Sequence, residues 1–395
     1  MRAWRGVGLV GGWQLTASVC FYAIFAATAF VRDDFGLSRT LVGVTVTATI
    51  LGYTLLLFVM GAAVDGYGER PVMVGGLAGL GLGAVGVAVA PSYALLLAAL
   101  LLVGGMYATA MPATNRAVLA VAPEGRRNLA MSLKQVGVTA GSGLSAVVVT
   151  GFATTRWGWR TGFLVAAALA ALVGAAFAYG YDGEDGSGSM SLPDVRGLLG
   201  EVEYRTLTAA GLFLGAAVFC TTGYVVLDMT ESVGAAAGVA GGVLALVQVT
   251  GSAGRIGGGA LADRLPTSDA QASALVLFAQ SALGALCFVA VTQVTTTLSA
   301  AVAFAALGVF VLGFPAIYYS CMTALVPEDR VGEATAGGQL TINVGGLVAP
   351  PLFGYLVDTG GYESGWLALA VCAGVAALLA ARLVLITRAQ TQAQL

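Results

Sequence analysis

Three basic side chains lie inside strongly apolar stretches of the sequence. They are Arg116, Lys134 and Arg255, and Lys134 is the only lysine in 395 residues. The sequence has no histidine, and every Asp and Glu falls in a polar connection or at the end of an apolar stretch, with Asp228 closest to an exception. Because a buried cation needs a compensating negative charge, this arrangement predicts a positive cavity that an anionic ligand would complete.

The same basic residues have a second interpretation. At 1.5 Å per helical residue, each lies about 10 to 15 Å from the nearest loop charge. From that depth a long side chain can extend along its helix to the charged surface, and Arg116 could instead bind carbonyl groups of neighbouring helices. A basic group inside the membrane costs at least ~2.5 kcal/mol, so we favour ligand binding, with Arg255 as the principal carboxylate-binding group.

Other polar residues recur at helical spacing in the apolar stretches. Gln248, Ser252 and Arg255 follow one another at i, i+4 and i+7, and therefore share one helix face. Further side chains expected to line the cavity are Asn115, Gln339, Asn343, Tyr224, Tyr318 and Tyr319. Hydrogen bonds between helices, worth about 0.6 kcal/mol on average in membranes, explain any single one of them equally well.

The composition identifies the elements that must position these groups. Hydrophobic residues make up 58% of the chain, charged residues 10%, and the mean hydropathy is +0.89. Apolar stretches of about 20 residues recur throughout and predict membrane-spanning helices rather than a barrel. The predicted fold is an all-α integral membrane protein with twelve transmembrane helices. Their approximate ranges are 7–30, 40–62, 71–90, 94–121, 129–153, 161–180, 205–228, 234–260, 271–292, 297–325, 333–356 and 364–387.

Several function classes are disfavoured by the same sequence. The five cysteines lie inside apolar segments without paired loop spacing, which is typical of small packing residues. The glycine-rich helical series, such as Gly137 and Gly141, indicate close helix packing rather than phosphate loops. An enzyme would need a nucleophile and base or a metal cluster. We therefore expect no cofactor, no metal and no nucleic-acid partner.

The positions of the basic residues predict an orientation. With both termini in the cytoplasm, eleven arginines fall in inner loops or tails, at positions 2, 5, 70, 126, 127, 196, 205, 264, 330, 382 and 388. Four fall outside, at positions 32, 39, 156 and 160. Because basic residues favour the cytoplasmic side, we expect a multi-pass protein of the inner membrane with cytoplasmic termini, which we take to be monomeric.

The two halves of the chain resemble each other. "GAAVDGYGER" (61–70) corresponds to "GGALADRLP" (258–266), and a Pro-Glu-x-Arg turn precedes an apolar segment at both 123–126 and 327–330. The offset of about 200 residues predicts a duplicated six-helix unit suited to rocking around a central site. The predicted domains are an N-terminal bundle (1–180), a cytoplasmic linker (181–204) and a C-terminal bundle (205–395).

These features resemble the major facilitator superfamily. Its loop pattern of Gly, three residues, Asp, two residues, Gly and two basic residues is met by Gly61, Asp65, Gly68 and Arg70, but Glu69 stands at the first basic position. The second copy keeps Gly259, Asp263 and Arg264 and lacks the later glycine. The resemblance implies a gating role for both loops, in which the first aspartate locks the outward-open state against the N-terminus of helix 11. We consider Arg70 as a partner of Asp65.

Branches of that family give a further resemblance. "GRIGGGALAD" (254–263) is similar to helix 8 of oxalate/formate antiporters and monocarboxylate transporters, where an arginine binds the substrate carboxylate. "KQVG" (134–137), preceded by "P-x-x-N-R" (112–116), is similar to cyanate/nitrate-like and organic-anion porters. Oxalate-type carriers place their lysine in helix 11, where this chain has Gln339 and Asn343. The resemblance implies Arg255, Lys134 and Arg116 as anion-binding groups.

The sequence therefore predicts a transporter that moves a small organic or inorganic anion by alternating access, with an exchanged anion or a co-transported proton as partner. An efflux pump for hydrophobic compounds is the nearest alternative, although such pumps commonly use an acid inside the membrane. A membrane sensor is less favoured, because neither the central loop nor the C-terminal tail is long enough for an output domain.

Overall fold

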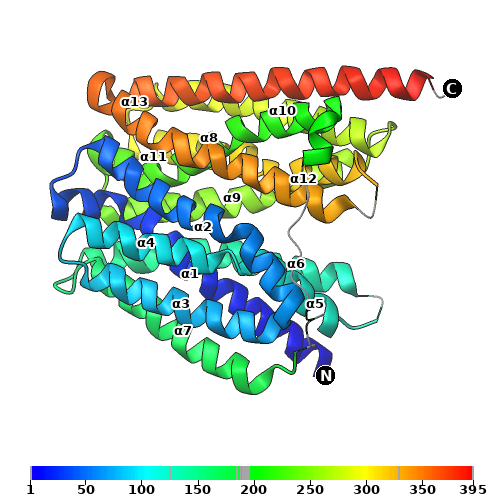
Figure 1. Cartoon of the computed structure of the whole chain (residues 1–395). Helices are drawn as coiled ribbons and strands as arrows, with labels where there is room; N and C mark the ends of the chain where they lie inside the picture. Colours follow the sequence, from blue (N-terminus) through cyan, green and yellow to red (C-terminus); the bar gives the residue numbers. More distant parts are fainter. Residues whose placement is uncertain are drawn as a thin grey trace. The chain divides into compact units, whose positions relative to one another are not determined.

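The structure is a computed structural model and describes residues 2–124, 126–183, 186, 188, 196–327 and 330–393 (Figure 1). The described chain is helical and contains no β-strand. The helices of the first half are α1 (Arg2–Phe35), α2 (Arg39–Tyr67), α3 (Glu69–Val89), α4 (Tyr93–Tyr107), α5 (Ala110–Val121), α6 (Arg127–Ala153) and α7 (Arg160–Gly180). Those of the second half are η1 (Arg196–Gly200), α8 (Val202–Glu231), α9 (Ala237–Ala262), α10 (Asp269–Val291), α11 (Thr297–Leu307), η2 (Gly308–Leu312), α12 (Phe314–Ala324) and α13 (Val331–Ala393).

Eleven helical segments of the described chain are long and apolar enough to cross a membrane. The last of them, within α13, is 59 residues long and contains Gly361, whose backbone angles of φ 77° and ψ 173° are not helical. This glycine lies between the predicted spans 333–356 and 364–387. Counting the two legs of α13 separately gives the predicted number of twelve, and the predicted all-α membrane fold is confirmed.

Two of the predicted spans are interrupted at matching places. The span predicted at 94–121 is divided into α4 and α5 three residues before Pro112, and the span predicted at 297–325 contains the π-helical turn η2 just before Pro315. A proline lacks the backbone donor, and its ring displaces the carbonyl four residues earlier. The helix must therefore break or widen on the N-terminal side of each proline, as it does here.

The chain divides into two compact units. The first comprises residues 1–36, 48–192 and 236–245, and the second comprises residues 37–47, 193–235 and 246–395. The division therefore passes through α2 and α9, each of which begins in one unit and ends in the other. Of the predicted linker 181–204, residues 184, 185, 187 and 189–195 lie outside the described residues.

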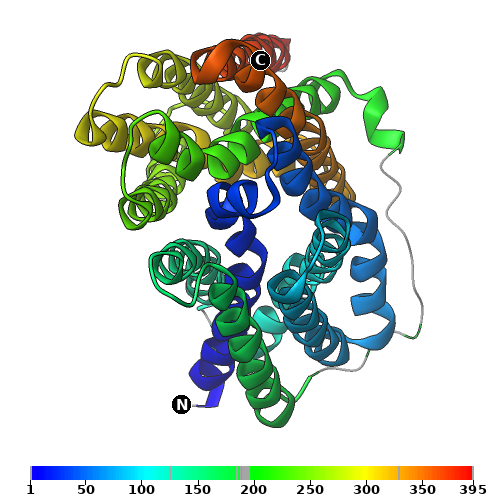
Figure 2. The ribbon, with the colours of Figure 1, turned by 90° about the vertical axis from the view of Figure 1, so that its left-hand side faces the viewer.

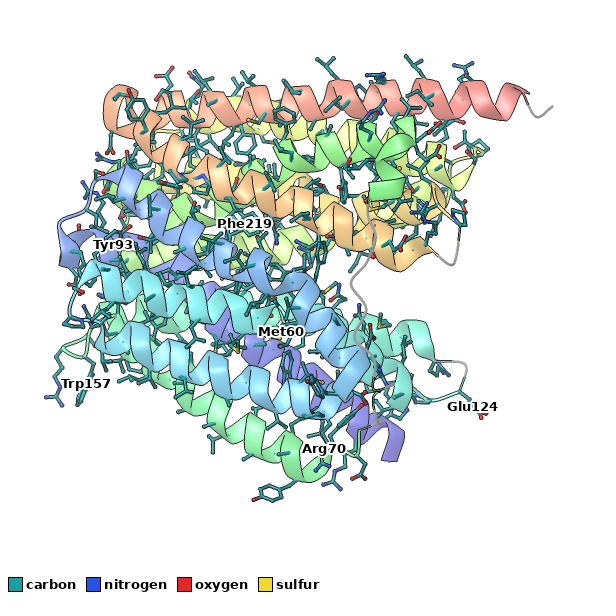
Figure 3. All side chains as sticks on the ribbon, in the orientation of Figure 1. Met60, Arg70, Tyr93, Glu124, Trp157 and Phe219 are labelled. Atoms are coloured by element: carbon teal, nitrogen blue, oxygen red, sulfur yellow. The ribbon has the colours of Figure 1, made fainter. Side chains whose placement is uncertain are left out.

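In the first unit, α1 packs against α5, α6 and α7, and α3 packs against α4 and α7, as the end-on view of Figure 2 shows. Glycines allow α6 to lie close to α1. A Cβ atom at Gly141 would overlap the carbonyl oxygen of Leu15, and a Cβ atom at Gly137 would lie 2.9 Å from the carbonyl oxygen of Gly11. The predicted packing role of these glycines is confirmed. Figure 3 places Arg70 and Glu124 at one end of this unit and Tyr93 and Trp157 at the other.

In the second unit, α13 packs along α8 and α10, and α10 packs against α11 and α12. The spans formed by α1 and α8 are the most completely buried of their respective units. Their side chains must therefore be satisfied by neighbouring helices rather than by lipid or water.

Candidate functional site

Lys134 projects from α6 toward α5 in the first unit. Its Nζ donates to Oδ1 of Asn115 at 2.7 Å and lies 3.9 Å from the sulfur of Met111. The side chain has no exposed surface. Among the described residues, no carboxylate oxygen lies within 4 Å of this ammonium, so its immediate partners are neutral. A side chain extended to the membrane surface would be exposed, and this geometry therefore argues against that interpretation.

Arg116 lies on α5, one residue beyond Asn115, but its surroundings are different. Its Nε lies 3.0 Å from Oε2 of Glu69, and one terminal nitrogen donates to the carbonyl oxygen of Val64 at 3.2 Å. Glu69 is fully buried in the first turn of α3, and its other oxygen accepts from the hydroxyl of Tyr181 at 3.0 Å. The expectation that all three cations lack a carboxylate partner is therefore wrong for Arg116.

The reason lies in the turn between α2 and α3. Gly68 adopts φ 84°, a left-handed conformation that suits glycine, and directs Glu69 back toward α5 at the start of α3. A carboxylate in the first turn of a helix is also favoured by the helix dipole. Glu69 stands where the superfamily pattern has a basic residue, and Arg116 supplies the opposite charge. The guanidinium of Arg116 is thus bound by protein groups.

Next to Asn115, a chain of buried polar groups crosses the first unit. The hydroxyl of Thr114 donates to Oε1 of Gln14 at 3.1 Å, and Nε2 of Gln14 donates to Ser18 at 3.3 Å. The hydroxyls of Ser18 and Tyr107 lie 3.3 Å apart. These hydrogen-bonded residues were not predicted from the sequence, although Gln14 and Ser18 share one helix face at i and i+4.

In the second unit, Arg255 lies half-buried on α9 beside η2. Its Nε donates to the carbonyl oxygen of Leu312 at 3.1 Å. Leu312 ends the π-helical turn, where backbone carbonyls depart from the regular helical ladder. The turn upstream of Pro315 therefore orients the guanidinium on α9.

Three amide side chains of the second unit were predicted to line the cavity, and two of them have a donor without an acceptor. Gln339 donates to Oδ1 of Asn343 at 2.8 Å and accepts from the hydroxyl of Tyr319 at 2.5 Å. This bond confirms that Gln339 and Asn343 share a face of α13. Nδ2 of the fully buried Asn343 and Nε2 of Gln248, which is 7% exposed, have no hydrogen-bond partner in the described chain. Unsatisfied buried donors are costly, and both are suited to an oxygen acceptor.

The two remaining predicted tyrosines join helices within the second unit. The hydroxyl of Tyr224 lies 2.8 Å from the carbonyl oxygens of both Arg39 and Pro350, and either of them can accept its single proton. The hydroxyl of Tyr318 lies 3.2 Å from that of Thr341 and 3.4 Å from the carbonyl oxygen of Gly338. Both side chains are fully buried, so the alternative of interhelical hydrogen bonding describes them better than cavity lining.

The predicted gate residues lie at helix ends. Asp65 and Arg70 are exposed, and Arg70 donates to the carbonyl oxygen of Ala178 at 2.7 Å, so its described partner is a backbone carbonyl and not Asp65. The space where a Cβ would lie is open at both Gly61 and Gly259. Asp263 and Arg264 are exposed in the turn that follows α9. Their gating role remains a prediction.

A charged cluster in the second unit was not predicted. Arg39, at the start of α2, lies 2.8 Å from Oε2 of Glu231 and 3.5 Å from Oδ1 of Asp358. Asp358 also accepts from the backbone N–H groups of Arg39 and Thr40 at 3.0 and 2.9 Å, and therefore caps the N-terminus of α2. The hydroxyl of Tyr362 donates to Glu231 at 2.9 Å. Arg39 had been counted only as a loop charge.

Comparison with known proteins agrees with this architecture. The sequence pattern of the Major Facilitator Superfamily matches residues 14–336 and 207–395. The hexuronate transporter of Bacillus subtilis is 24% identical over 378 residues, covering 91% of this chain and 89% of that protein. The fold is similar to a bacterial homologue of the human lysosomal transporter Spinster in an inward-facing and occupied conformation, with a TM-score of 0.80, 15% identity and 96% of both chains covered. It is also similar to a POT family transporter in complex with 5-aminolevulinic acid, with a TM-score of 0.77 and 12% identity. This match covers 97% of this chain and 96% of that transporter.

Proposed function

Since this chain belongs to the Major Facilitator Superfamily, and is thus a membrane transporter, we propose that it carries a small organic anion with a carboxylate group. Lys134 of the first unit and Arg255 of the second are the proposed anion-binding groups. The proposed transport cycle is alternating access, with the orientation predicted from the loop arginines.

The observation that carries the proposal is the environment of Lys134. Its ammonium is fully buried, and its partners are an amide oxygen and a thioether. A buried ammonium without a counter-charge is strongly disfavoured, and pairing with an anion removes much of that cost. A substrate carboxylate would replace Met111, and in part Asn115, as the partner of Nζ. The charge-assisted bond so formed is stronger than the neutral one.

The second unit offers complementary groups. Gln248 and Asn343 each present a buried amide donor without an acceptor, and Arg255 is oriented by the carbonyl oxygen of Leu312. Amide donors suit hydroxyl and carboxylate oxygens. We therefore propose Arg255 as a carboxylate-binding group, and Gln248 and Asn343 as donors to oxygen atoms of an anion.

The relative from Bacillus subtilis favours a hydroxylated carboxylate within this class, because that protein is a hexuronate transporter. Identity of 24% over nearly the whole chain supports the class of substrate, and we propose a sugar acid as the first candidate. Arg116 is left out of the binding groups, since Glu69 already neutralises it.

The test is counterflow in proteoliposomes loaded with one anion and supplied outside with its radiolabelled form. D-glucuronate, D-galacturonate, lactate and oxalate would be compared in the wild-type protein and in Lys134→Gln and Arg255→Gln. We expect exchange of at least one organic anion, lost in both variants and retained in Arg156→Gln, which changes an exposed loop arginine. Transport of cationic drugs without exchange of any of these anions would contradict the proposal and favour the efflux alternative.

A further inference from the structure

We infer that Tyr319, Gln339 and Asn343 form a site of the second unit that recognises two neighbouring hydroxyl groups of the substrate, with Tyr319 as a positioning residue. The inference rests on the proposed function, which supplies an organic anion as substrate. It deepens that function by naming the groups that separate a sugar acid from a simple carboxylate.

The three side chains form one directed series of hydrogen bonds between α12 and α13. The hydroxyl of Tyr319 donates to Oε1 of Gln339 at 2.5 Å, and Nε2 of Gln339 donates to Oδ1 of Asn343 at 2.8 Å. An amide has an acceptor on one side and a donor on the other, so the direction of the first bond fixes the direction of the second. The series therefore ends in a donor, Nδ2 of Asn343.

This terminal donor is left without an acceptor. Asn343 is fully buried, and its Nδ2 has no hydrogen-bond partner in the described chain. Asn343 lies twelve residues after Val331, where α13 begins. That separation is about 18 Å along the helix, near the middle of a hydrocarbon core about 30 Å thick. An amide nitrogen at this depth has little access to bulk water, and an oxygen atom of a ligand would satisfy it.

The surrounding side chains favour a neutral ligand group over a charged one. No charged residue occurs in α12, or in α13 between Glu333 and Asp358. A carboxylate bound here would lose its hydration without gaining a cation from either helix, whereas a hydroxyl suits a neutral amide. Oδ1 of Asn343 has two lone pairs, and Gln339 uses one. A free donor and a free lone pair on one amide suit two neighbouring hydroxyls, one accepting and the other donating.

Tyr319 is held in place by its neighbour on α12. The rings of Tyr318 and Tyr319 meet edge to face, with centroids 5.4 Å apart, and the hydroxyl of Tyr318 lies 3.2 Å from that of Thr341 on α13. The approach of the two helices depends on Gly338, because a Cβ atom there would lie only 3.2 Å from the ring of Tyr318. Tyr318 therefore joins α12 to α13, and Tyr319 sets the direction of the amide series.

Without the hydroxyl of Tyr319, the amide series could reverse. Gln339 would then turn its oxygen toward Asn343, and Nδ2 of Asn343 would donate to Gln339 instead of to a ligand. The site would present only an acceptor. Tyr319 thus acts through Asn343, and its loss should weaken the recognition of hydroxyl groups more than the binding of a carboxylate.

The experiment measures selectivity for hydroxyl groups in the full-length protein. Proteoliposomes would exchange the labelled organic anion that the wild-type protein carries, with unlabelled D-glucuronate or tetrahydropyran-2-carboxylate as competitor. The second acid keeps the ring and the carboxylate but has no hydroxyl group. We expect the wild-type protein to prefer D-glucuronate and Tyr319→Phe to lower this preference about tenfold, as the loss of one hydrogen bond implies. Tyr318→Phe is the matched control and should leave the preference unchanged, since Tyr318 bonds to Thr341 and not to the amides.

Asn343→Leu, which removes the terminal donor itself, is the second variant and should abolish the preference between the two acids. A purely structural role of Tyr319 would weaken both competitors alike, so an unchanged preference in Tyr319→Phe or in Asn343→Leu would overturn the inference. Wild-type protein that exchanges organic anions without preferring D-glucuronate would also overturn it and leave the proposed function intact. Exchange of no organic anion by the wild-type protein would contradict the proposed function, and the inference with it.

Discussion

Lys134 and Arg116 are two basic residues of the same unit, only 18 residues apart, but their hydrogen-bond and ion-pair partners differ. Arg116 has a buried carboxylate at 3.0 Å, whereas Lys134 has an amide oxygen at 2.7 Å and a thioether. Both residues were predicted to bind substrate from their position in an apolar helix. The contrast shows that depth in the membrane is not sufficient evidence for a binding role.

The decisive property is whether the chain supplies the counter-charge. Glu69 neutralises Arg116 and accepts a hydrogen bond from Tyr181, so this cluster is complete without a ligand. The ammonium of Lys134 has only neutral partners in the described chain, and a ligand can therefore contribute the missing charge. Breaking the first pair should thus affect folding, and changing Lys134 should affect binding.

The largest effect is expected from Glu69→Gln. The change leaves the guanidinium of Arg116 partly buried without its carboxylate, which should lower the free energy of unfolding by about 3 kcal/mol. Thermal unfolding in detergent measures the loss. The double variant Glu69→Gln with Arg116→Gln should recover part of it, and Glu124→Gln, which changes an exposed carboxylate of the same unit, should change little. Equal stability of all these variants would remove the structural role assigned to the pair.

Lys134→Gln should reverse this pattern. Loss of a charge-assisted bond of about 2 kcal/mol corresponds to roughly thirtyfold weaker anion binding, and stability should stay equal or rise because an uncompensated buried charge is removed. Isothermal titration with the transported anion measures the first effect and thermal unfolding the second. A large loss of stability with unchanged affinity would mean that Lys134 is structural.

Asn115→Asp sharpens the comparison by giving Lys134 a carboxylate of its own, as Arg116 already has. The internal pair should compete with the ligand and weaken anion binding about tenfold, while the thermal unfolding temperature rises. The control is the same change combined with Lys134→Gln, in which the gain in stability should disappear. Tighter anion binding in Asn115→Asp would contradict the assignment of Lys134.

Tyr181→Phe should give the smallest effect. It removes one hydrogen bond to Glu69 and leaves the ion pair with Arg116 in place, so the free energy of unfolding should fall by about 1 kcal/mol. Affinity for the anion should be unchanged, because Tyr181 makes no described contact with Lys134. A change in anion affinity would mean that the Glu69–Arg116 pair influences anion binding at Lys134, and would contradict the separate roles assigned to them.

Much of the fold follows from the sequence, because membrane helices are specified by the length and apolarity of local segments. The predicted spans match the described helices, and the breaks before Pro112 and Pro315 have a local cause. The charge pairs do not follow in this way. Glu69 and Arg116 are 47 residues apart, and Arg39 and Asp358 are 319 apart, so only the packed helices bring them together.

The candidate site was predictable in part for the same reason. Lys134 was identified because a single lysine in an apolar helix stands out locally, and the shared face of Gln339 and Asn343 follows from helical periodicity. The hydrogen bonds of Tyr224 and Tyr318 to other helices use backbone carbonyl groups as acceptors. Every residue has such a group, so these partners cannot be identified from the sequence. The contacts of Trp366 with Phe288 and Phe304 likewise join segments that are far apart in the sequence.

The central claim is that a ligand carboxylate supplies the counter-charge of Lys134. The most direct measurement compares the thermal stabilisation of the purified protein by D-glucuronate and by D-glucose, which differ in the carboxylate, in wild type and in Lys134→Gln. We expect D-glucuronate, but not D-glucose, to raise the unfolding temperature of the wild-type protein, and we expect this rise to be lost in Lys134→Gln. Equal stabilisation of wild type and Lys134→Gln by D-glucuronate would contradict it.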